Sequence, residues 1–529
     1  MKNLHWLKLK NHSNQRRRFL RNSSLLAAAS TLPFSAANAY ADGSTLRVRS
    51  YSDMQSLDPA FSSGVVDEEI QGPIYNKLVQ YKPGREWGWQ LDAAQMVKQV
   101  SDTRIDFALR DDIGFSNGFG AMTAEDVKFS FERIISSDLK SSNKPDMGSL
   151  SHVEVTGERT GTVVLSEPFA PLWSIALPYI TGNIVSKKAV EKADGGRIGT
   201  DPLAESGPYR RHEWKPKEKT VLKRNPDWRG PAPAFDTIEI YPIDDEKIAE
   251  IAFESNELDY TRVSIDSVQR YRNNPPAGAT LAEYPSLFYV WIGMNLDNAQ
   301  LQNKKLRQAI QYVIDIPSIL EGAYHGVATA STGIIAPGLA GHRAKSIVPP
   351  EANIEKAQQL LADSGERNVS LTLDVINKSV YTTIAQIVQA NLQQIGINLE
   401  INVHEAGSFW SLGDESKGEQ WKNVQLILNR FSMTPDPYYA TSWFTQEQVG
   451  VWNWERFRSQ EFDDLHKKAA QEFDVAKRDA MYQRAQDLLE ESGAYRFITH
   501  EATPVVYSNT IRPAFRPDGL PLFRYFKRA

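Results

Sequence analysis

Residues 97–133 read VKQVSDTRIDFALRDDIGFSNGFGAMTAEDVKFSFER, and this stretch decides the fold class of the chain. Polar and apolar residues alternate over residues 104–109, as they do in a half-buried strand. A glycine-containing segment follows, and then Thr123 offers a hydroxyl cap with an acid, Asp126, three residues later. Beyond this cap, apolar residues recur at helical spacing: Val127, Phe131, Ile134 and Ile135. The stretch therefore predicts a strand, a loop and a helix in succession.

A second unit of this kind is predicted in the C-terminal half. Apolar residues alternate over residues 371–375, residues 381–395 have helical spacing up to Gly396, and alternation resumes over residues 397–403. A crossover of this length favours parallel pairing of the two strands. We therefore predict an α/β fold.

Two more helices are predicted from their apolar spacing. One covers residues 69–78, and the other covers residues 354–361 and stops at Gly365. A chain of 529 residues is also too long for a single compact core, so several domains are expected.

The N-terminus predicts an export signal. Residues 1–39 contain seven Lys or Arg and no acid, an apolar segment at 25–37 that is too short to span a bilayer, and the cleavable end Ala37-Asn38-Ala39. Residues 15–21, QRRRFLR, resemble the twin-arginine export motif, although a Sec signal rich in arginine is the alternative. We expect a signal peptide over residues 1–39 and a periplasmic mature protein.

Composition limits the partners of the mature chain. Losing the seven positive charges of the signal changes the formal net charge from −5 to −12, which argues against nucleic acid as a partner. The chain has no cysteine, so it can form no disulfide and cannot carry a lipid on an N-terminal cysteine. We expect an exported protein without a lipid anchor.

Seven short motifs give the chain a recognisable order. They are Leu57-Asp58-Pro59, the 97–133 stretch, Gly207-Pro208-Tyr209, residues 224–228 (RNPDW), Asn295 before residues 306–309 (LRQA), the 357–365 helix, and Asp436-Pro437. In this order they resemble family 5 of the extracellular solute-binding proteins, the peptide and nickel receptors of ABC importers.

The resemblance implies a two-lobed periplasmic-binding-protein clamshell of class II, with an extra domain inserted in the first lobe. Lobe I would comprise residues 40–78, 195–285 and 496–529, the extra domain residues 79–194, and lobe II residues 286–495. It also implies a small-molecule ligand held between the lobes and delivery to ABC permease and ATPase subunits. A monomer without a cofactor is expected.

Catalytic motifs do not favour an enzyme. The nine histidines are dispersed without a His-Glu-x-x-His motif, and no Walker lysine follows Gly118 and Gly120. We therefore predict that the protein is not an enzyme, with an exported enzyme kept as the alternative from another class.

Residues 429–454 read NRFSMTPDPYYATSWFTQEQVGVWNW and carry the best candidates for binding. Aromatic rings and a guanidinium near turns suit a small-ligand cleft, although most rings in a protein pack in the core. The candidate ligand contacts are Arg430, Phe431, Asp436, Trp443, Trp452 and Trp454. The resemblance favours Arg430, Phe431 and Trp443 in particular, because this region faces the ligand in the family.

The same region departs from the family pattern. Peptide-binding relatives place an aspartate three to four residues before the Asp-Pro-like dipeptide, where it pairs with the α-ammonium of the ligand. Here the residues before Asp436 include Phe431, Ser432, Met433 and Thr434, none of which is acidic. A peptide or peptide-like ligand is the default, and an anionic conjugate, an opine-like compound or a chelated metal is the alternative.

The resemblance adds two further groups of candidates. Ser62, Ser63 and Asp67 match a segment that reaches the cleft in relatives, although Asp67 also suits the start of a helix. Tyr289, Trp291 and Asn295 stand where the chain would cross between lobes.

Overall fold

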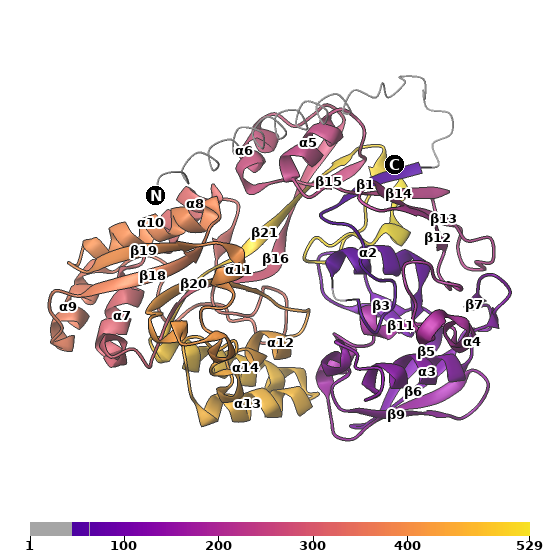
Figure 1. Cartoon of the computed structure of the whole chain (residues 1–529), viewed down its shortest axis with the longest axis horizontal. Coiled ribbons are helices and arrows are strands. Elements are labelled where there is room, and N and C mark those ends of the chain that lie inside the picture. Colours follow the sequence, from indigo (N-terminus) through magenta and orange to yellow (C-terminus); the bar gives the residue numbers. More distant parts are fainter. Residues whose placement is uncertain (1–44, 63) are drawn as a thin grey trace, which may run out of the picture. The chain divides into compact units, whose positions relative to one another are not determined.

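The computed structural model describes residues 45–62 and 64–529 (Figure 1). The predicted signal peptide and the candidate residue Ser63 lie outside the described residues. Within the described ranges, no helix is long and apolar enough to cross a membrane.

Residues 97–133 form the strand and helix that their pattern predicts. Ile105, Phe107 and Leu109 point into a core that they share with the apolar face of the following helix. The strands form an antiparallel sheet in the order β5-β6-β10-β9. Its elements are β5 (Ala94–Ser101), β6 (Arg104–Leu109), β9 (Leu150–Val155), β10 (Thr160–Leu165) and the helix α3 (Ala124–Ile135).

The start of α3 is held by Asp126. Its Oδ2 accepts the backbone N–H of Thr123 at 2.9 Å and the Thr123 hydroxyl at 2.8 Å. Its Oδ1 accepts the backbone N–H of Lys187, at the start of α4 (Lys187–Lys192), at 2.9 Å. One carboxylate therefore caps one helix and fixes the next.

The end of α3 is tied to a distant motif. Arg133 donates two hydrogen bonds to Asp58, at 2.6 and 3.0 Å, and Asp58 also accepts the backbone N–H of Ile198 at 3.0 Å. Only 9% of the Arg133 side chain and 1% of the Asp58 side chain are exposed. The paired geometry joins α3 to the Leu57-Asp58-Pro59 turn.

The main sheet of the described residues has eleven strands and confirms the α/β prediction. Its order is β12-β13-β14-β1-β15-β21-β16-β20-β18-β19, and β17 pairs with β21 beside this path. The strands are β12 (Tyr209–Lys215), β13 (Lys219–Arg224), β14 (Thr237–Pro242), β1 (Thr45–Ser50), β15 (Tyr260–Arg262), β21 (Tyr495–Ser508), β16 (Ala279–Met294), β20 (Leu426–Ser432), β18 (Ser370–Ile376), β19 (Asn398–His404) and β17 (Thr329–Ala330).

The predicted β-α-β unit is confirmed. β18 and β19 pair in parallel along their full length, and the helix between them is α10 (Ser379–Gln393), followed by Gly396 with φ of +78°. The predicted helix before this unit is α9 (Ile354–Ser364), and it ends at Gly365 in the left-handed conformation. Together with α7 (Lys304–Val313) and α8 (Ile316–Tyr324), these helices bury one continuous apolar core.

One predicted helix is displaced. Residues 69–78 were expected to be helical, but α2 spans Val65–Ile74 and Tyr75 is extended. Asn76 and Lys77 instead form β2, which pairs with β11 (Asn183–Ile184). The physical reason is that strand pairing across the chain outweighs the local helical pattern.

Two long strands connect the halves of the main sheet. β21 pairs with β15 near its C-terminal end, and β16 pairs with β20 near its own C-terminal end, while β16 and β21 pair with each other along most of their length (Figure 1). Their ladder has two irregularities: the longer lies near the middle, where Pro285 pairs with Ala502 and the next pair is Tyr289 with His500, and a shorter one follows between Val290 and Trp291. Three residues of β16 thus lie opposite the single residue Glu501.

The remaining helices surround this frame. α12 (Pro437–Ser442), α13 (Gln460–Gln471) and α14 (Val475–Glu491) follow β20 and enclose a second apolar core with the inner face of β16. α5 (Glu246–Glu254), α6 (Ile265–Asn273) and the short α11 (Ala406–Phe409) complete the elements used below.

The segment that follows the sheet of residues 94–165 touches the region of α12 through side chains. The Phe169 ring meets Tyr438 edge-on at 5.4 Å, and the Ser174 hydroxyl donates to Asp436 at 2.5 Å. The lobe and extra-domain boundaries stated above stay a prediction.

We predict that Arg133→Ala destabilises the protein by about 3–5 kcal/mol, because Asp58 would remain buried without its cation. Chemical denaturation followed by circular dichroism measures the loss. Arg104→Ala is the matched control, since it breaks an ion pair with Glu154 in which about two fifths of each side chain is exposed. Equal unfolding curves for the two variants would contradict the structural role of the Arg133–Asp58 pair.

Candidate functional site

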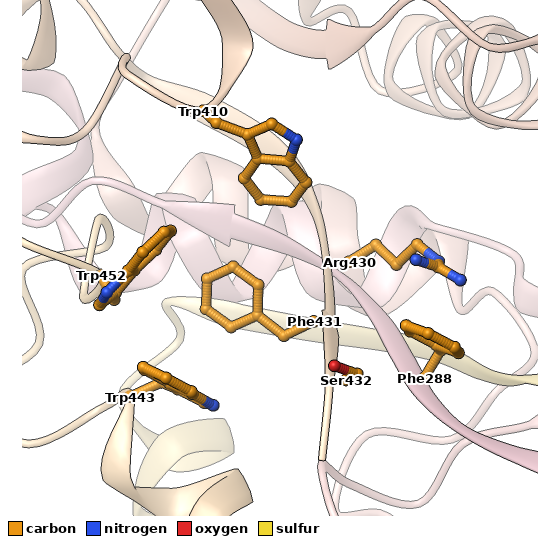
Figure 2. A pocket seen from close by; sticks show the side chains of 7 residues that line it. All are labelled: Phe288, Trp410, Arg430, Phe431, Ser432, Trp443 and Trp452. Carbon is orange, nitrogen blue, oxygen red and sulfur yellow. The ribbon is translucent and has the colours of Figure 1, made fainter. Parts of the chain in front are cut away.

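A pocket of about 310 Å³ lies at the C-terminal end of β20 (Figure 2). Its walls come from four parts of the chain: β16, β20, the residue after α11, and the segment that follows α12. The lining residues are Phe288, Trp410, Arg430, Phe431, Ser432, Trp443 and Trp452. Four of the predicted ligand residues, Arg430, Phe431, Trp443 and Trp452, are therefore brought together.

The pocket exists because one edge of β20 is uncovered. β18 pairs with β20 only at Leu426 and Ile427, whereas β16 pairs with it through Ser432. Beyond Ile427 the strand has a neighbour on one side only. Consecutive side chains of a strand point to opposite faces, so a pocket at this edge can contact Arg430, Phe431 and Ser432 in turn.

Three rings form a corner in the pocket. The planes of Phe431 and Trp452 meet at 87°, those of Phe431 and Trp443 at 67°, and those of Trp443 and Trp452 at 73°, with ring centroids 5.8–6.0 Å apart. Trp410 is inclined by only 29° to Phe431 and extends that wall. Figure 2 shows Trp452 and Trp443 flanking Phe431, with Trp410 beyond it. The arrangement presents aromatic surface on several sides of one space.

Arg430 lies at the other end of the pocket. Its guanidinium stacks on Phe288 at 3.6 Å, and its Nε donates to Glu501 at 2.8 Å. The second oxygen of Glu501 accepts the Tyr381 hydroxyl at 2.9 Å. Burial disfavours the charged guanidinium, but the Glu501 carboxylate outweighs it and raises the pKa of Arg430. Arg430 therefore stays cationic, with 31% of its side chain exposed.

A buried carboxyl stands behind the aromatic wall. Glu455 is fully buried and accepts the indole N–H of Trp291 at 2.8 Å, and Trp291 contacts Phe431 edge-on at 5.0 Å. Gly293 makes room for this carboxyl, because a Cβ there would lie 1.9 Å from Glu455 Oε1. Burial raises the pKa of Glu455 to about 7, although the Trp291 hydrogen bond lowers it.

The structure places Asp436 outside the pocket lining, contrary to expectation. Its side chain is 1% exposed, caps α12 through the backbone N–H of Tyr438 at 2.9 Å, and pairs with Arg478 at 2.7 Å. Ser174 occupies its other oxygen. Asp436 is thus committed to helix capping and to the contact with the Ser174 segment.

The other expected contacts are also placed in cores. Tyr289 and Trp291 are buried on the face of β16 opposite to Phe288, and Trp454 is 2% exposed behind Trp452. Asn295 donates to the carbonyl of Val424 at 2.9 Å.

The two described candidates near the chain start hold local turns. Ser62 donates to the carbonyl of Asp58 at 2.7 Å, and Asp67 accepts the backbone N–H of Gln55 at 2.9 Å. Both side chains are buried, and neither lines the pocket.

Sequence reasoning missed Phe288, Trp410 and Ser432. The period of two along β16 carried a usable signal, because Phe288 and Tyr289 must face opposite ways and only one of them can face the Arg430 side. The choice between the two faces comes from the register, in which Phe288 pairs with Ser432. For Trp410, which follows α11 outside the 429–454 segment, we find no signal in the sequence.

One motif of catalytic type is present but buried. Residues 114–118 have the spacing Gly-x-Ser-x-Gly, yet Ser116 is fully buried and its hydroxyl donates to Glu205 at 3.1 Å. No substrate can reach that hydroxyl. In the described ranges, no group of three or more His, Asp or Glu side chains is placed to hold a metal ion.

The chain resembles known proteins along most of its length. Residues 89–450 match the family model described as bacterial extracellular solute-binding proteins, family 5. A probable D,D-dipeptide-binding periplasmic protein, DdpA of Escherichia coli, is 26% identical over 90% of this chain and 92% of its own length. The glutathione-binding protein GsiB of Shigella flexneri is 25% identical over 83% of this chain and 85% of its own length.

A solved structure shows the same fold. The ABC transporter substrate-binding protein CtaP of Listeria monocytogenes superposes with a TM-score of 0.79 at 20% identity, covering 92% of this chain and 99% of that one. The predicted binding-protein fold is thereby confirmed.

We predict that Glu455→Gln changes how stability depends on pH. The wild-type carboxyl keeps its proton up to about pH 7 when folded but loses it near 4.5 when unfolded, so its contribution to stability is lost as the pH rises between these values. Glutamine cannot ionise and can still accept the Trp291 N–H. The stability of the variant relative to wild type should therefore rise from pH 5 to pH 7 and level off above pH 8, as measured by denaturant unfolding.

The matched control for this prediction is Glu461→Gln, because 54% of the Glu461 side chain is exposed. If Glu455→Gln and Glu461→Gln follow the same pH profile, the buried carboxyl is not the group responsible.

Proposed function

The chain belongs to family 5 of the bacterial extracellular solute-binding proteins, and from this we propose that it captures a small peptide-like solute and delivers it to the permease of an ABC importer. The names of both relatives specify peptide ligands, a D,D-dipeptide and glutathione, and this supports the ligand class. Both names also describe binding proteins, which supports capture rather than catalysis.

The observation that carries the proposal is the position of the pocket beside the interrupted ladder. Phe288 belongs to the three residues of β16 that lack a partner in β21, and it also lines the pocket. Glu501, opposite those residues, holds Arg430. A ligand that touches Arg430 and Phe288 therefore touches the point where two connecting strands are least constrained, as closure about a hinge requires.

Capture between lobes also needs a surface opposite the pocket. All seven lining residues lie within 288–452, inside the segment assigned to lobe II. The contacts Ser174–Asp436 and Phe169–Tyr438 bring the 94–184 region against α12, whose C-cap is Trp443. We assign the other side of the enclosed ligand to lobe I and the extra domain on this basis.

The proposal includes the setting in which the protein works. Export through the twin-arginine signal, release into the periplasm without a lipid anchor, and action as a monomer with permease and ATPase subunits are all part of it. The sequence of residues 1–39 supports the export route, the lack of cysteine supports a form without a lipid anchor, and the family match supports work with a permease.

We expect native mass spectrometry of the protein, purified without unfolding, to reveal a bound small molecule that is lost on denaturation. Adding the identified molecule to ligand-free protein at about 100 times Kd should stabilise the fold by about 2.7 kcal/mol and raise the melting temperature. Trp443→Ala should weaken that response at least about tenfold in Kd, because it removes one wall of the aromatic corner.

Trp421→Ala is the matched control, since Trp421 is half-buried under the Arg456 guanidinium and precedes the start of β20, at the end of the strand away from the pocket. It should leave the response unchanged. A protein that carries no small molecule and responds to no peptide would refute the proposed function.

A further inference from the structure

The polar side chains that line the pocket all offer hydrogen-bond donors. The Trp443 indole N–H is buried and has no acceptor among the described residues. The Ser432 hydroxyl is exposed, and the hydrogen bonds of Arg430 engage its Nε, leaving the two terminal amino groups of the guanidinium. All three side chains offer donors, and a buried N–H without an acceptor is a cost that a ligand can remove.

No carboxylate is among the described residues that line the pocket, and the neighbouring acids have partners elsewhere. Glu501 accepts from Arg430 and Tyr381 through its two oxygens. Asp436 is held by Arg478 and Ser174, and Glu455 lies behind Trp291. An ammonium group brought into this pocket would lose its water and gain no anionic partner.

The apolar side of the pocket sets the size of the group it takes. A volume of 310 Å³ is at the lower end for ligand pockets, so it accommodates one ring-sized group rather than a whole peptide. Figure 2 shows the rings of Trp452, Phe431 and Trp410 at one end and Arg430 with Phe288 at the other, with the Trp443 nitrogen directed toward Ser432. The pocket is therefore lined by aromatic rings at one end and by the Arg430 guanidinium at the other.

The rings could in principle attract a cation through their faces. Here, however, the pocket also contains the Arg430 guanidinium and the positive end of the Trp443 N–H dipole. Both repel a cation and attract an anion. The electrostatics of the lining therefore oppose a quaternary ammonium ligand.

We propose that the pocket binds a ring-bearing carboxylate with no ammonium beside it, as in an N-acylated aromatic amino acid or the equivalent end of a blocked peptide. The ring packs into the corner of Phe431, Trp443 and Trp452. The carboxylate accepts from Arg430, Ser432 and the Trp443 N–H. This inference rests on the proposed function and specifies the ligand class for the same site.

The test compares small probes that differ by one group, using saturation-transfer NMR and calorimetry on the full-length mature protein. The probes are N-acetyl-L-phenylalanine, L-phenylalanine, N-acetyl-L-alanine, N-acetyl-L-phenylalaninamide, phenyltrimethylammonium and the tripeptide Ala-Phe-Ala. We expect N-acetyl-L-phenylalanine to bind tightest, by about tenfold or more in Kd over each of the others.

Variants of the lining residues test where the ring and the carboxylate of the probe bind. Trp452→Ala should abolish the preference for the ring, and Arg430→Gln should abolish the preference for the carboxylate over the amide. Trp421→Ala should change neither. Melting temperatures close to wild type show that each variant is folded, and Arg430→Lys, which keeps the charge, provides a second test of the carboxylate preference.

The outcomes separate the two claims. If Ala-Phe-Ala, L-phenylalanine or phenyltrimethylammonium equals or exceeds N-acetyl-L-phenylalanine, the inference is overturned while solute capture stands. The same holds if the acetylated alanine binds as well as the acetylated phenylalanine. If no probe binds and native mass spectrometry finds no bound molecule, the proposed function falls and the inference falls with it.

Discussion

The structure depends on a pair of strands that belong to both halves of one sheet. β16 and β21 pair with each other and with different partners at each end, so any movement between the halves has to pass through their ladder. Backbone hydrogen bonds resist bending wherever they are made. The longer gap, at residues 286–288, is therefore where this ladder opposes bending least.

The pocket lies beside these strands, at the outer edge of β20. β20 follows β16 in register and leaves its outer edge free beyond Ile427, where β18 stops pairing. The rings that surround the free edge come from segments outside the sheet, whereas Arg430 and Phe288 come from the sheet itself. Under the proposed function, recognition of the ligand and restraint of the connecting strands meet in the contacts among Arg430, Phe288 and Glu501.

Local sequence patterns predicted the elements well where packing and pattern agree. The capped helix after Thr123 and the unit around α10 follow from periodicity and from glycine at the helix end. The helix at α2 was displaced because Asn76 and Lys77 find a strand partner more than a hundred residues away, which no local pattern contains.

Rings in the 429–454 segment were correctly associated with a pocket, but Trp454 and Asp436 show that composition alone does not separate lining residues from their supports. The missing acid before Asp436 remained informative, because the described residues of the lining include no acid either.

The chain contains twelve tryptophans, and three of them line a single pocket. Their indoles stand beside the space that a ligand fills, so filling it replaces water next to three chromophores at once. Filling of the pocket by a ligand should therefore change the tryptophan fluorescence of the protein, without any attached dye. Under the proposed function, the indoles that contact the ligand also report by fluorescence whether the pocket is occupied.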